Sequence, residues 1–144
     1  WLMIRGLRTL PIRMERIAAT TREVLAFLEA HPRVRRVYSP HAAANPQLGL
    51  GERQLRGASG LLTIDLDVDG VAAVERFCDA LQRFLMTVSW GGYESLAFPV
   101  CAVFPADAPL RSGSGVPLSL VRLSIGLEDA DVLIADLDAA LARL

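Results

Sequence analysis

The chain has 144 residues, a length that suits one domain. Its residues are 52% hydrophobic and 22% charged, values that are typical of a folded domain and exclude a disordered or low-complexity chain. Fifteen basic residues stand against sixteen acidic ones, so the net charge is −1 and no basic excess is left to neutralise a phosphate backbone. We therefore expect no nucleic-acid partner.

The start of the chain excludes a membrane span and a signal peptide. Arg5 and Arg8 interrupt the first hydrophobic stretch, so no apolar run approaches the length that crosses a bilayer. The same stretch lacks the continuous apolar core of a secretory signal. We therefore expect no membrane association and a cytoplasmic location.

The kinds of reactive side chain in this sequence limit its chemistry. All fifteen basic residues are arginines, and no lysine is present, so the chain alone cannot form the Schiff base that needs a lysine amine. Cys78 and Cys101 lie far apart and outside any C-x-x-C motif, and His31 and His41 add no zinc-ligand spacing. We expect reduced cysteines rather than a disulfide, and no metal.

The first predicted element is a long helix over about residues 11–30. Apolar residues recur at helical spacing from Met14 to Leu28, with charged residues on the opposite face. Pro11 suits the first turn of a helix, and His31-Pro32 ends it because the residue before a proline disfavours the helical conformation.

Strands are expected on both sides of a long loop. Residues 34–38 form a short apolar and basic run that ends at a proline, and residues 61–66 are rich in β-branched and leucine residues. Between them, residues 39–60 contain many prolines and glycines and are predicted to be mostly loop, with a short helix around residues 48–55.

A second amphipathic helix is predicted after the 61–66 strand. Asp67 and Asp69 are expected to cap it. Its apolar stripe is expected to comprise Val71, Val74, Phe77, Cys78, Leu81 and Leu85. Met86–Trp90 is then expected to be extended and to run into Gly91-Gly92.

The last third of the chain predicts two strands and a helix. Val100–Phe104 is expected as a short strand within a segment, residues 97–118, that holds four prolines. Val121–Ile125 alternates apolar and polar residues as a half-buried strand does. A final helix is expected from Glu128 onward, with an acidic N-terminus that suits the helix dipole. Its predicted buried face comprises Val132, Leu133, Leu137 and Leu141.

The order of these elements predicts an α+β fold, a small mainly antiparallel sheet with helices packed on one face. The strict alternation of strand and helix that marks a doubly wound fold is missing from the sequence.

Arg122 is the strongest candidate for a functional side chain. It lies between Val121 and Leu123 in a predicted strand, where burying a guanidinium is costly unless it meets an anion. The planar fork of arginine matches a carboxylate, which makes a strand-borne arginine a natural anchor for one. The alternative, that the side chain simply points to solvent from the polar face of the strand, remains open.

The second candidate is the segment Ser89-Trp90-Gly91-Gly92-Tyr93-Glu94-Ser95. Two glycines let a backbone approach a ligand closely, and the neighbouring serine, tryptophan and tyrosine offer hydrogen bonds and an apolar wall. A simple tight turn is the competing interpretation. The sequence does not assemble a Ser-His-Asp or Cys-His triad.

Three segments resemble the C-terminal part of the Cys/Met-metabolism family of pyridoxal-phosphate (PLP) enzymes. They are Arg5–Met14, Ser89–Leu96 and Val121–Asp129, and they occur in the family's order and spacing over nearly the whole chain. The Ser-Trp-Gly-Gly-Tyr-Glu-Ser-Leu form and the segment Leu133–Asp138 are most similar to the bacterial cystathionine β-lyase branch.

The resemblance implies roles for four residues of a fold-type I C-terminal domain. Arg122 would bind the α-carboxylate of an amino-acid thioether substrate, Ser89 would help to hold it, and Trp90 and Tyr93 would form the nearby wall. The residue before that serine is Val88, and an apolar residue there fits β-elimination better than γ-chemistry.

The implied function is β-elimination at a cysteine thioether in sulfur amino-acid metabolism, that is, transsulfuration and methionine biosynthesis. The alternatives are a γ-synthase or γ-lyase relative, or a non-catalytic binding or assembly module that keeps the fold. The family also implies a homo-oligomer, a tetramer for the intact enzyme.

The chain departs from the family pattern at its front. In the family, a PLP-binding domain precedes these segments and supplies the Schiff-base lysine, whereas this chain starts at Trp1 and has no lysine. We therefore expect residues 1–144 to be the C-terminal substrate-carboxylate domain, with PLP present in the intact enzyme. Alone, the fragment is expected to hold no cofactor, to contain no catalytic residue and to be inactive.

Overall fold

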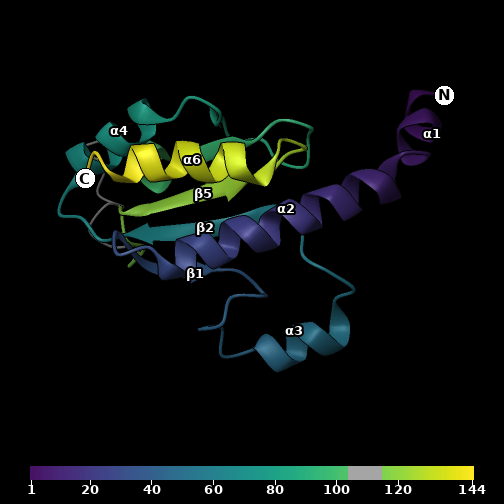
Figure 1. The fold of residues 1–144 in the computed structure, drawn as a ribbon, viewed down its shortest axis with the longest axis horizontal. Coiled ribbons are helices and arrows are strands. Elements are labelled where there is room, and N and C mark those ends of the chain that lie inside the picture. The colour runs from purple at the N-terminus through teal and green to yellow at the C-terminus, as the bar shows by residue number, and fades with distance from the viewer. Residues whose placement is uncertain (104–114) are drawn as a thin grey trace.

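The structure is a computed structural model that describes residues 1–103 and 115–144. Helices and strands alternate irregularly along the chain (Figure 1). The helices are α1 (Leu2–Leu7), α2 (Leu10–Ala30), α3 (Leu48–Gln54), α4 (Val71–Ala80), the 3₁₀ helix η1 (Val100–Val103) and α6 (Ala130–Leu141). The strands are β1 (Val34–Tyr38), β2 (Leu61–Leu66), β3 (Leu85–Met86), β4 (Leu96–Pro99) and β5 (Leu120–Ser124).

The strands form one sheet in the order β1-β2-β5-β4-β3. The β1–β2, β2–β5 and β5–β4 pairs are antiparallel, and β3 pairs with β4 in parallel. The prediction of a small, mainly antiparallel α+β sheet is therefore confirmed. Because β5 lies between β2 and β4, its side chains occupy the middle of both faces of the sheet.

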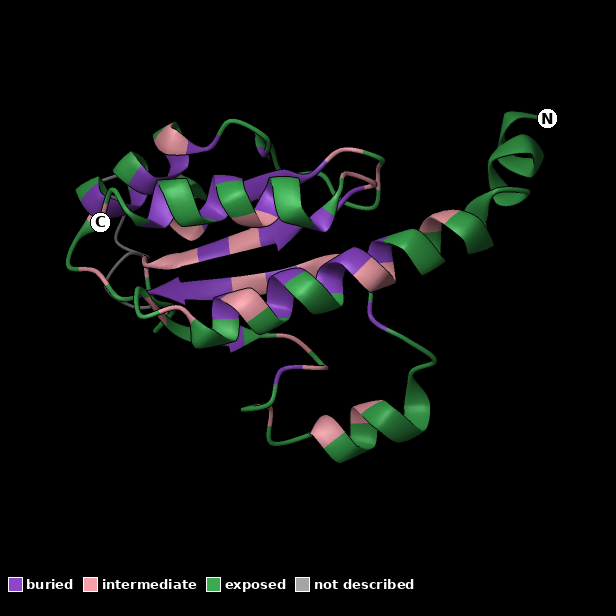
Figure 2. Ribbon diagram, in the orientation of Figure 1, coloured by how far each residue is buried: buried purple, intermediate pink, exposed green. Residues whose placement is uncertain are grey.

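Helices α2, α6 and α4 cover one face of this sheet. Helix α6 contacts both α2 and α4, and α2 and α6 lie in front of the strands in Figure 1. The sides of these helices that face the sheet are buried (Figure 2). The largest fully buried side chains of this core include Val24, Leu28, Ile64, Leu66, Phe77, Leu123, Leu133 and Leu137. Burying one such leucine or phenylalanine contributes about 1.5–3 kcal/mol, so this layer supplies most of the fold's apolar stabilisation.

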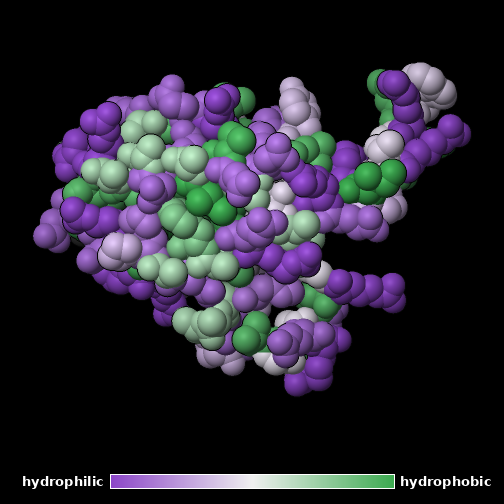
Figure 3. All heavy atoms as spheres, in the orientation of Figure 1, coloured by the Kyte–Doolittle hydropathy of each residue, from purple (hydrophilic) through white to green (hydrophobic). Residues whose placement is uncertain are grey.

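The N-terminal segment projects from the domain. Every residue of α1 is exposed, and so are most residues in the first turns of α2 (Figures 1 and 2). Figure 3 shows hydrophobic side chains on this projecting end. Trp1, Met3 and Leu2 are 85%, 83% and 72% exposed. Among the described residues, no helix combines the length and the apolar character needed to cross a membrane.

Several predicted boundaries are confirmed. Helix α2 includes Pro11 in its first turn and ends at Ala30, before His31-Pro32. Strands β1, β2 and β5 and the short helix α3 also lie where the sequence predicts them. These are elements whose signals come from neighbouring residues alone.

The predicted capping of α4 is wrong. Gly70 occupies the N-cap position with a φ of +83°, a conformation that glycine adopts without strain. The Asp67 carboxylate instead accepts a hydrogen bond of 2.9 Å from Nη2 of Arg35 on β1. This contact raises the pKa of the Arg35 guanidinium above its ordinary value. Leu85 also leaves the predicted stripe, because α4 ends at Ala80 and Leu85 is 59% exposed in β3.

The predicted strand at Val100–Phe104 is also wrong. Residues Val100–Val103 form η1, and the strand precedes them as β4, while Phe104 lies outside the described residues. Of the expected extended segment Met86–Trp90, only Met86 belongs to a strand. On the last helix Val132 is 41% exposed, whereas the other three residues of the predicted face are buried.

Candidate functional site

Arg122 lies at the centre of the sheet face opposite the three helices. On β5 its neighbours Val121 and Leu123 are fully buried against the helical layer. Strand alternation therefore turns the Arg122 side chain toward the other face. There it is in register with Thr63 of β2 and Phe98 of β4.

The Arg122 guanidinium is held by a ring and two backbone carbonyls. Its Cζ lies 5.3 Å from the centroid of the Phe98 ring, a cation–π arrangement. Its Nη2 donates hydrogen bonds to the carbonyl oxygens of Val88 and Ser89, the second at 3.0 Å. The side chain is therefore partly covered, rather than extended into solvent.

This cation has unused hydrogen-bonding capacity. Within residues 1–103 and 115–144 Arg122 forms no ion pair, and its buried Nε has no hydrogen-bond partner. A buried donor without a partner costs about 1–3 kcal/mol, so an anion that accepted from this edge of the guanidinium would be favoured. Chemically, the arrangement can bind a carboxylate.

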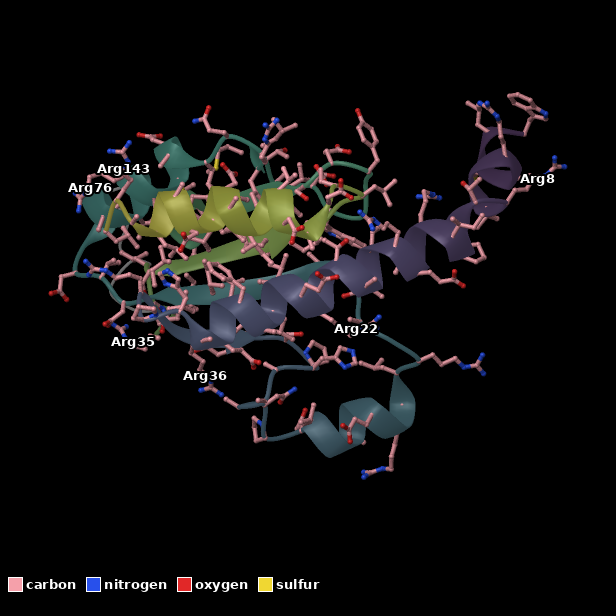
Figure 4. The ribbon with its side chains drawn as sticks, viewed as in Figure 1. Arg8, Arg22, Arg35, Arg36, Arg76 and Arg143 are labelled. Atoms are coloured by element: carbon pink, nitrogen blue, oxygen red, sulfur yellow. The ribbon has the colours of Figure 1, made fainter. Side chains whose placement is uncertain are left out.

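Other arginines differ from Arg122 in their surroundings. Those labelled in Figure 4 are all exposed and lie just after α1, on α2, on β1, on α4 and after α6; they are Arg8, Arg22, Arg35, Arg36, Arg76 and Arg143. Arg122 has only intermediate exposure. A partly desolvated guanidinium interacts with an anion more strongly than an exposed one, because water screens it less.

The structure brings the backbone of Ser89 to Arg122, while the Trp90 and Tyr93 side chains are mostly exposed. Ser89 meets Arg122 through its backbone carbonyl. Trp90 is 63% exposed, and it lines, with Met14 and Ile17 of α2 among others, a hollow of about 100 Å³. Tyr93 is 74% exposed, and its backbone carbonyl accepts a hydrogen bond of 2.8 Å from the amide of Leu127.

The sequence analysis missed the roles of two residues that hold residues 87–95, the Ser89 loop between β3 and β4. Ser95, which is fully buried, donates from its amide to Glu128 Oε1 and from its hydroxyl to Glu128 Oε2, each at 2.8 Å. Its Oγ in turn accepts from the amide of Gly126 at 2.9 Å. The sequence suggested only a dipole role for Glu128, because nothing local shows that β4 and β5 pair.

Gly126 permits this close approach. A Cβ on Gly126 would overlap the carbonyl oxygen of Tyr93, and it would lie 2.5 Å from Glu128 Oε2 and 2.6 Å from the carbonyl carbon of Glu94. Ordinary Cβ atoms do not come so near to other atoms, so only glycine fits between the loop and the β5–α6 connection. In the sequence, the signal for this close packing is the glycine in the segment Ser-Ile-Gly-Leu-Glu, residues 124–128.

Neither a metal cluster nor a reactive thiol is evident among the described residues. They contain no group of three or more His, Cys, Asp or Glu residues arranged to hold a metal ion. Burial raises the pKa of the Cys78 thiol to about 12, so it is protonated and unreactive near neutral pH. The Arg122 guanidinium is suited to a carboxylate. The chain has no lysine, so its own side chains do not fit an aldehyde cofactor that is held through an amine.

The chain is similar to known proteins over almost its whole length. The family model described as Cys/Met metabolism PLP-dependent enzyme matches residues 1–142. A cystathionine β-lyase of Bordetella avium is 42% identical over 144 residues, covering 99% of this chain and 35% of the relative. An L-methionine γ-lyase of Pseudomonas deceptionensis is 37% identical over 145 residues, covering 99% of this chain and 36% of the relative.

A solved structure has the same fold. The cystathionine γ-synthase of Xanthomonas oryzae pv. oryzae in complex with cystathionine superposes with a TM-score of 0.86 at 37% identity. The match covers 99% of this chain and 37% of that one. The chain therefore spans little more than a third of the length of the proteins it matches.

Proposed function

The chain belongs to the family of Cys/Met metabolism PLP-dependent enzymes, and we propose that it is the C-terminal substrate-carboxylate domain of a carbon–sulfur lyase. The observation that carries the proposal is Arg122, a partly buried cation with an unpartnered Nε beside the Ser89 loop. An enzyme that acts on amino acids needs such a cation for the carboxylate common to its substrates.

The role we propose for this chain is to bind and orient the substrate. Arg122 pairs with the α-carboxylate through guanidinium N–H groups that the Val88 and Ser89 carbonyls do not occupy, and the Ser89 hydroxyl donates to the same carboxylate. Trp90 and Tyr93 form the wall beside it. When bound in the intact enzyme, PLP supplies the electron sink for loss of the α-proton. A fixed carboxylate limits rotation of the substrate, which lowers the entropic cost of reaching the reactive orientation.

We propose cystathionine or a related cysteine thioether as the substrate. The presence of cystathionine in the Xanthomonas complex supports this class. β-Elimination would consume cystathionine and water and release homocysteine, pyruvate and ammonia. Transsulfuration and methionine biosynthesis, a cytoplasmic location and a homo-oligomeric assembly stay part of the same proposal.

A γ-eliminating enzyme is the second candidate, because γ-lyase and γ-synthase relatives match this chain about as well. γ-Elimination of cystathionine would release cysteine, 2-oxobutanoate and ammonia instead. The apolar Val88 before Ser89 favours the β-reaction. Identifying the 2-oxo acid formed from cystathionine by mass spectrometry distinguishes the two reactions.

The test of the proposal is substitution of Arg122 in the intact enzyme. Arg122→Lys keeps the charge and loses the bidentate fork, and Arg122→Ala loses both. Since hydrogen bonds to charged groups contribute about 1.5–3 kcal/mol, we expect kcat/KM for cystathionine to fall roughly 10- to 150-fold in the lysine variant and further in the alanine variant.

Controls separate binding from folding. Arg22→Ala, at an exposed arginine on α2, should leave kcat/KM unchanged. An amine analogue without a carboxylate should be far less sensitive to both Arg122 substitutions. A well-folded Arg122→Ala enzyme, judged by its melting temperature, with unchanged kcat/KM would overturn the assignment.

A further inference from the structure

The loop that faces Arg122 is tied to the same strand that carries Arg122. Residues 87–95 connect β3 to β4, and the tip of this loop donates from the Gly91 amide to Ser124 Oγ at 3.4 Å. Near its end, the Tyr93 carbonyl accepts from Leu127 at 2.8 Å, and Ser95 binds Glu128. The loop is thus held to the end of β5 and to the connection that follows it.

Glu128 makes the strongest of these ties. Its two carboxylate oxygens each accept a hydrogen bond of 2.8 Å from Ser95, one from the amide and one from the hydroxyl. Hydrogen bonds to an ionised acceptor are stronger than those between neutral groups. In the part of the chain that the structure describes, Glu128 forms no ion pair, so its partners are the loop donors rather than a surface cation.

From these contacts we propose that Glu128 is a positioning residue for the substrate site. By fixing Ser95, it fixes the loop whose Val88 and Ser89 carbonyls hold Nη2 of Arg122 and so set the orientation of the guanidinium, whose Nε has no partner. The proposal rests on the function assigned to Arg122 above. It adds that the competent orientation of Arg122 depends on a carboxylate that does not touch the substrate.

The consequence is a specific change in kinetics. When only a fraction of the molecules holds the binding-competent conformation, the apparent dissociation constant rises by the inverse of that fraction. Releasing the loop so that about one molecule in ten is competent raises KM about tenfold. Saturating substrate shifts the molecules into the competent conformation before the chemical step, so kcat changes little.

The first measurement needs no catalysis. Side-chain ¹⁵N relaxation of the Arg122 Nε–H group in the 144-residue chain reports whether the guanidinium is fixed. We expect a rigid group in the wild type, and an order parameter below about 0.6 after Glu128→Ala. Glu128→Gln keeps one acceptor oxygen for Ser95 and should be intermediate. The matched control is Asp129→Ala, since Asp129 is exposed and pairs with Arg16 on α2.

The second measurement is the KM and kcat of the intact enzyme with cystathionine. Glu128→Ala should raise KM about tenfold with kcat within a factor of two or so, and Asp129→Ala should leave both unchanged. If Glu128→Ala does not fold, Glu128→Gln and Ser95→Ala take its place, because each removes only part of the clamp.

The outcomes separate this inference from the proposed function. An Arg122 signal that stays rigid in every folded Glu128 or Ser95 variant overturns the positioning role, whatever Arg122 does. If the signal loosens but Arg122→Ala leaves kcat/KM intact, the clamp holds Arg122 and the carboxylate assignment is wrong. A fall in kcat with unchanged KM would also contradict the positioning role.

Discussion

Replacing Gly126 by alanine tests the packing between the Ser89 loop and the β5–α6 connection. The added Cβ would meet three atoms that lie closer than a real Cβ tolerates, and two of them belong to the backbone of Tyr93 and Glu94. The third is Oε2 of Glu128, 2.5 Å away, which also accepts the Ser95 hydroxyl. The methyl group can therefore be accommodated only if the loop or the Glu128 side chain moves.

The expected cost follows from these contacts. Inserting a methyl group into a closely packed site costs about 1–3 kcal/mol. Displacing Glu128 weakens its hydrogen bonds with Ser95, each of the charged kind that contributes about 1.5–3 kcal/mol. The lower entropy of the unfolded alanine chain returns only about 0.4–1 kcal/mol. We expect a net loss of about 3 kcal/mol, a large part of the roughly 5–15 kcal/mol that stabilises a typical domain.

Thermal and denaturant unfolding of the 144-residue chain measure this loss. For a chain of this size, 3 kcal/mol corresponds to a fall in Tm of about 10 °C. Gly57→Ala is the matched control, because a Cβ there has no atom within 4 Å and its φ is not positive. If Gly126→Ala unfolds within about 2 °C of that control, the close packing described here is wrong.

Three further predictions concern the chain without any partner. Because it has no lysine, incubation with PLP followed by borohydride should leave no stoichiometric covalent adduct on an internal residue, and mass spectrometry detecting one would contradict this expectation. The exposed apolar residues of α1 should cause self-association, so a clean monomer in sedimentation at high concentration, without binding of an apolar dye, would count against it. Burial raises the Cys78 pKa from 9.0 to about 12, so between these values the unfolded state binds fewer protons than the folded state. The unfolding free energy should therefore fall as pH rises above about 9, by up to about 1.4 kcal/mol per unit, and a Cys78→Ala variant with the same slope would refute this cause.

The sequence by itself determines those elements whose signals are local. Helical spacing, Pro11 and His31-Pro32 locate α2 closely, and β-branched runs locate β1 and β2. Each of these signals lies within a few residues of the element it defines. The sequence also singles out Arg122 and Ser89 as candidates, through an unusual residue in an apolar strand and a serine beside two glycines.

Tertiary structure decided the features that depend on a competing partner. Asp67 could have capped α4, but the pairing of β1 with β2 brings Arg35 within hydrogen-bond distance of its carboxylate. An apolar run such as Val100–Val103 is compatible with several conformations, and in the structure it forms the 3₁₀ helix η1. The strand forms instead at Leu96–Pro99, where it pairs in register with β5.

The site itself also required the tertiary structure. Arg122 contacts Ser89, and Glu128 contacts Ser95, each across 33 residues of sequence. Both contacts exist because β4 pairs with β5, which brings the loop before β4 against the end of β5. Strand order and register follow from the packing of the whole domain rather than from neighbouring residues, so the sequence identifies candidate groups but not the groups that hold them in place.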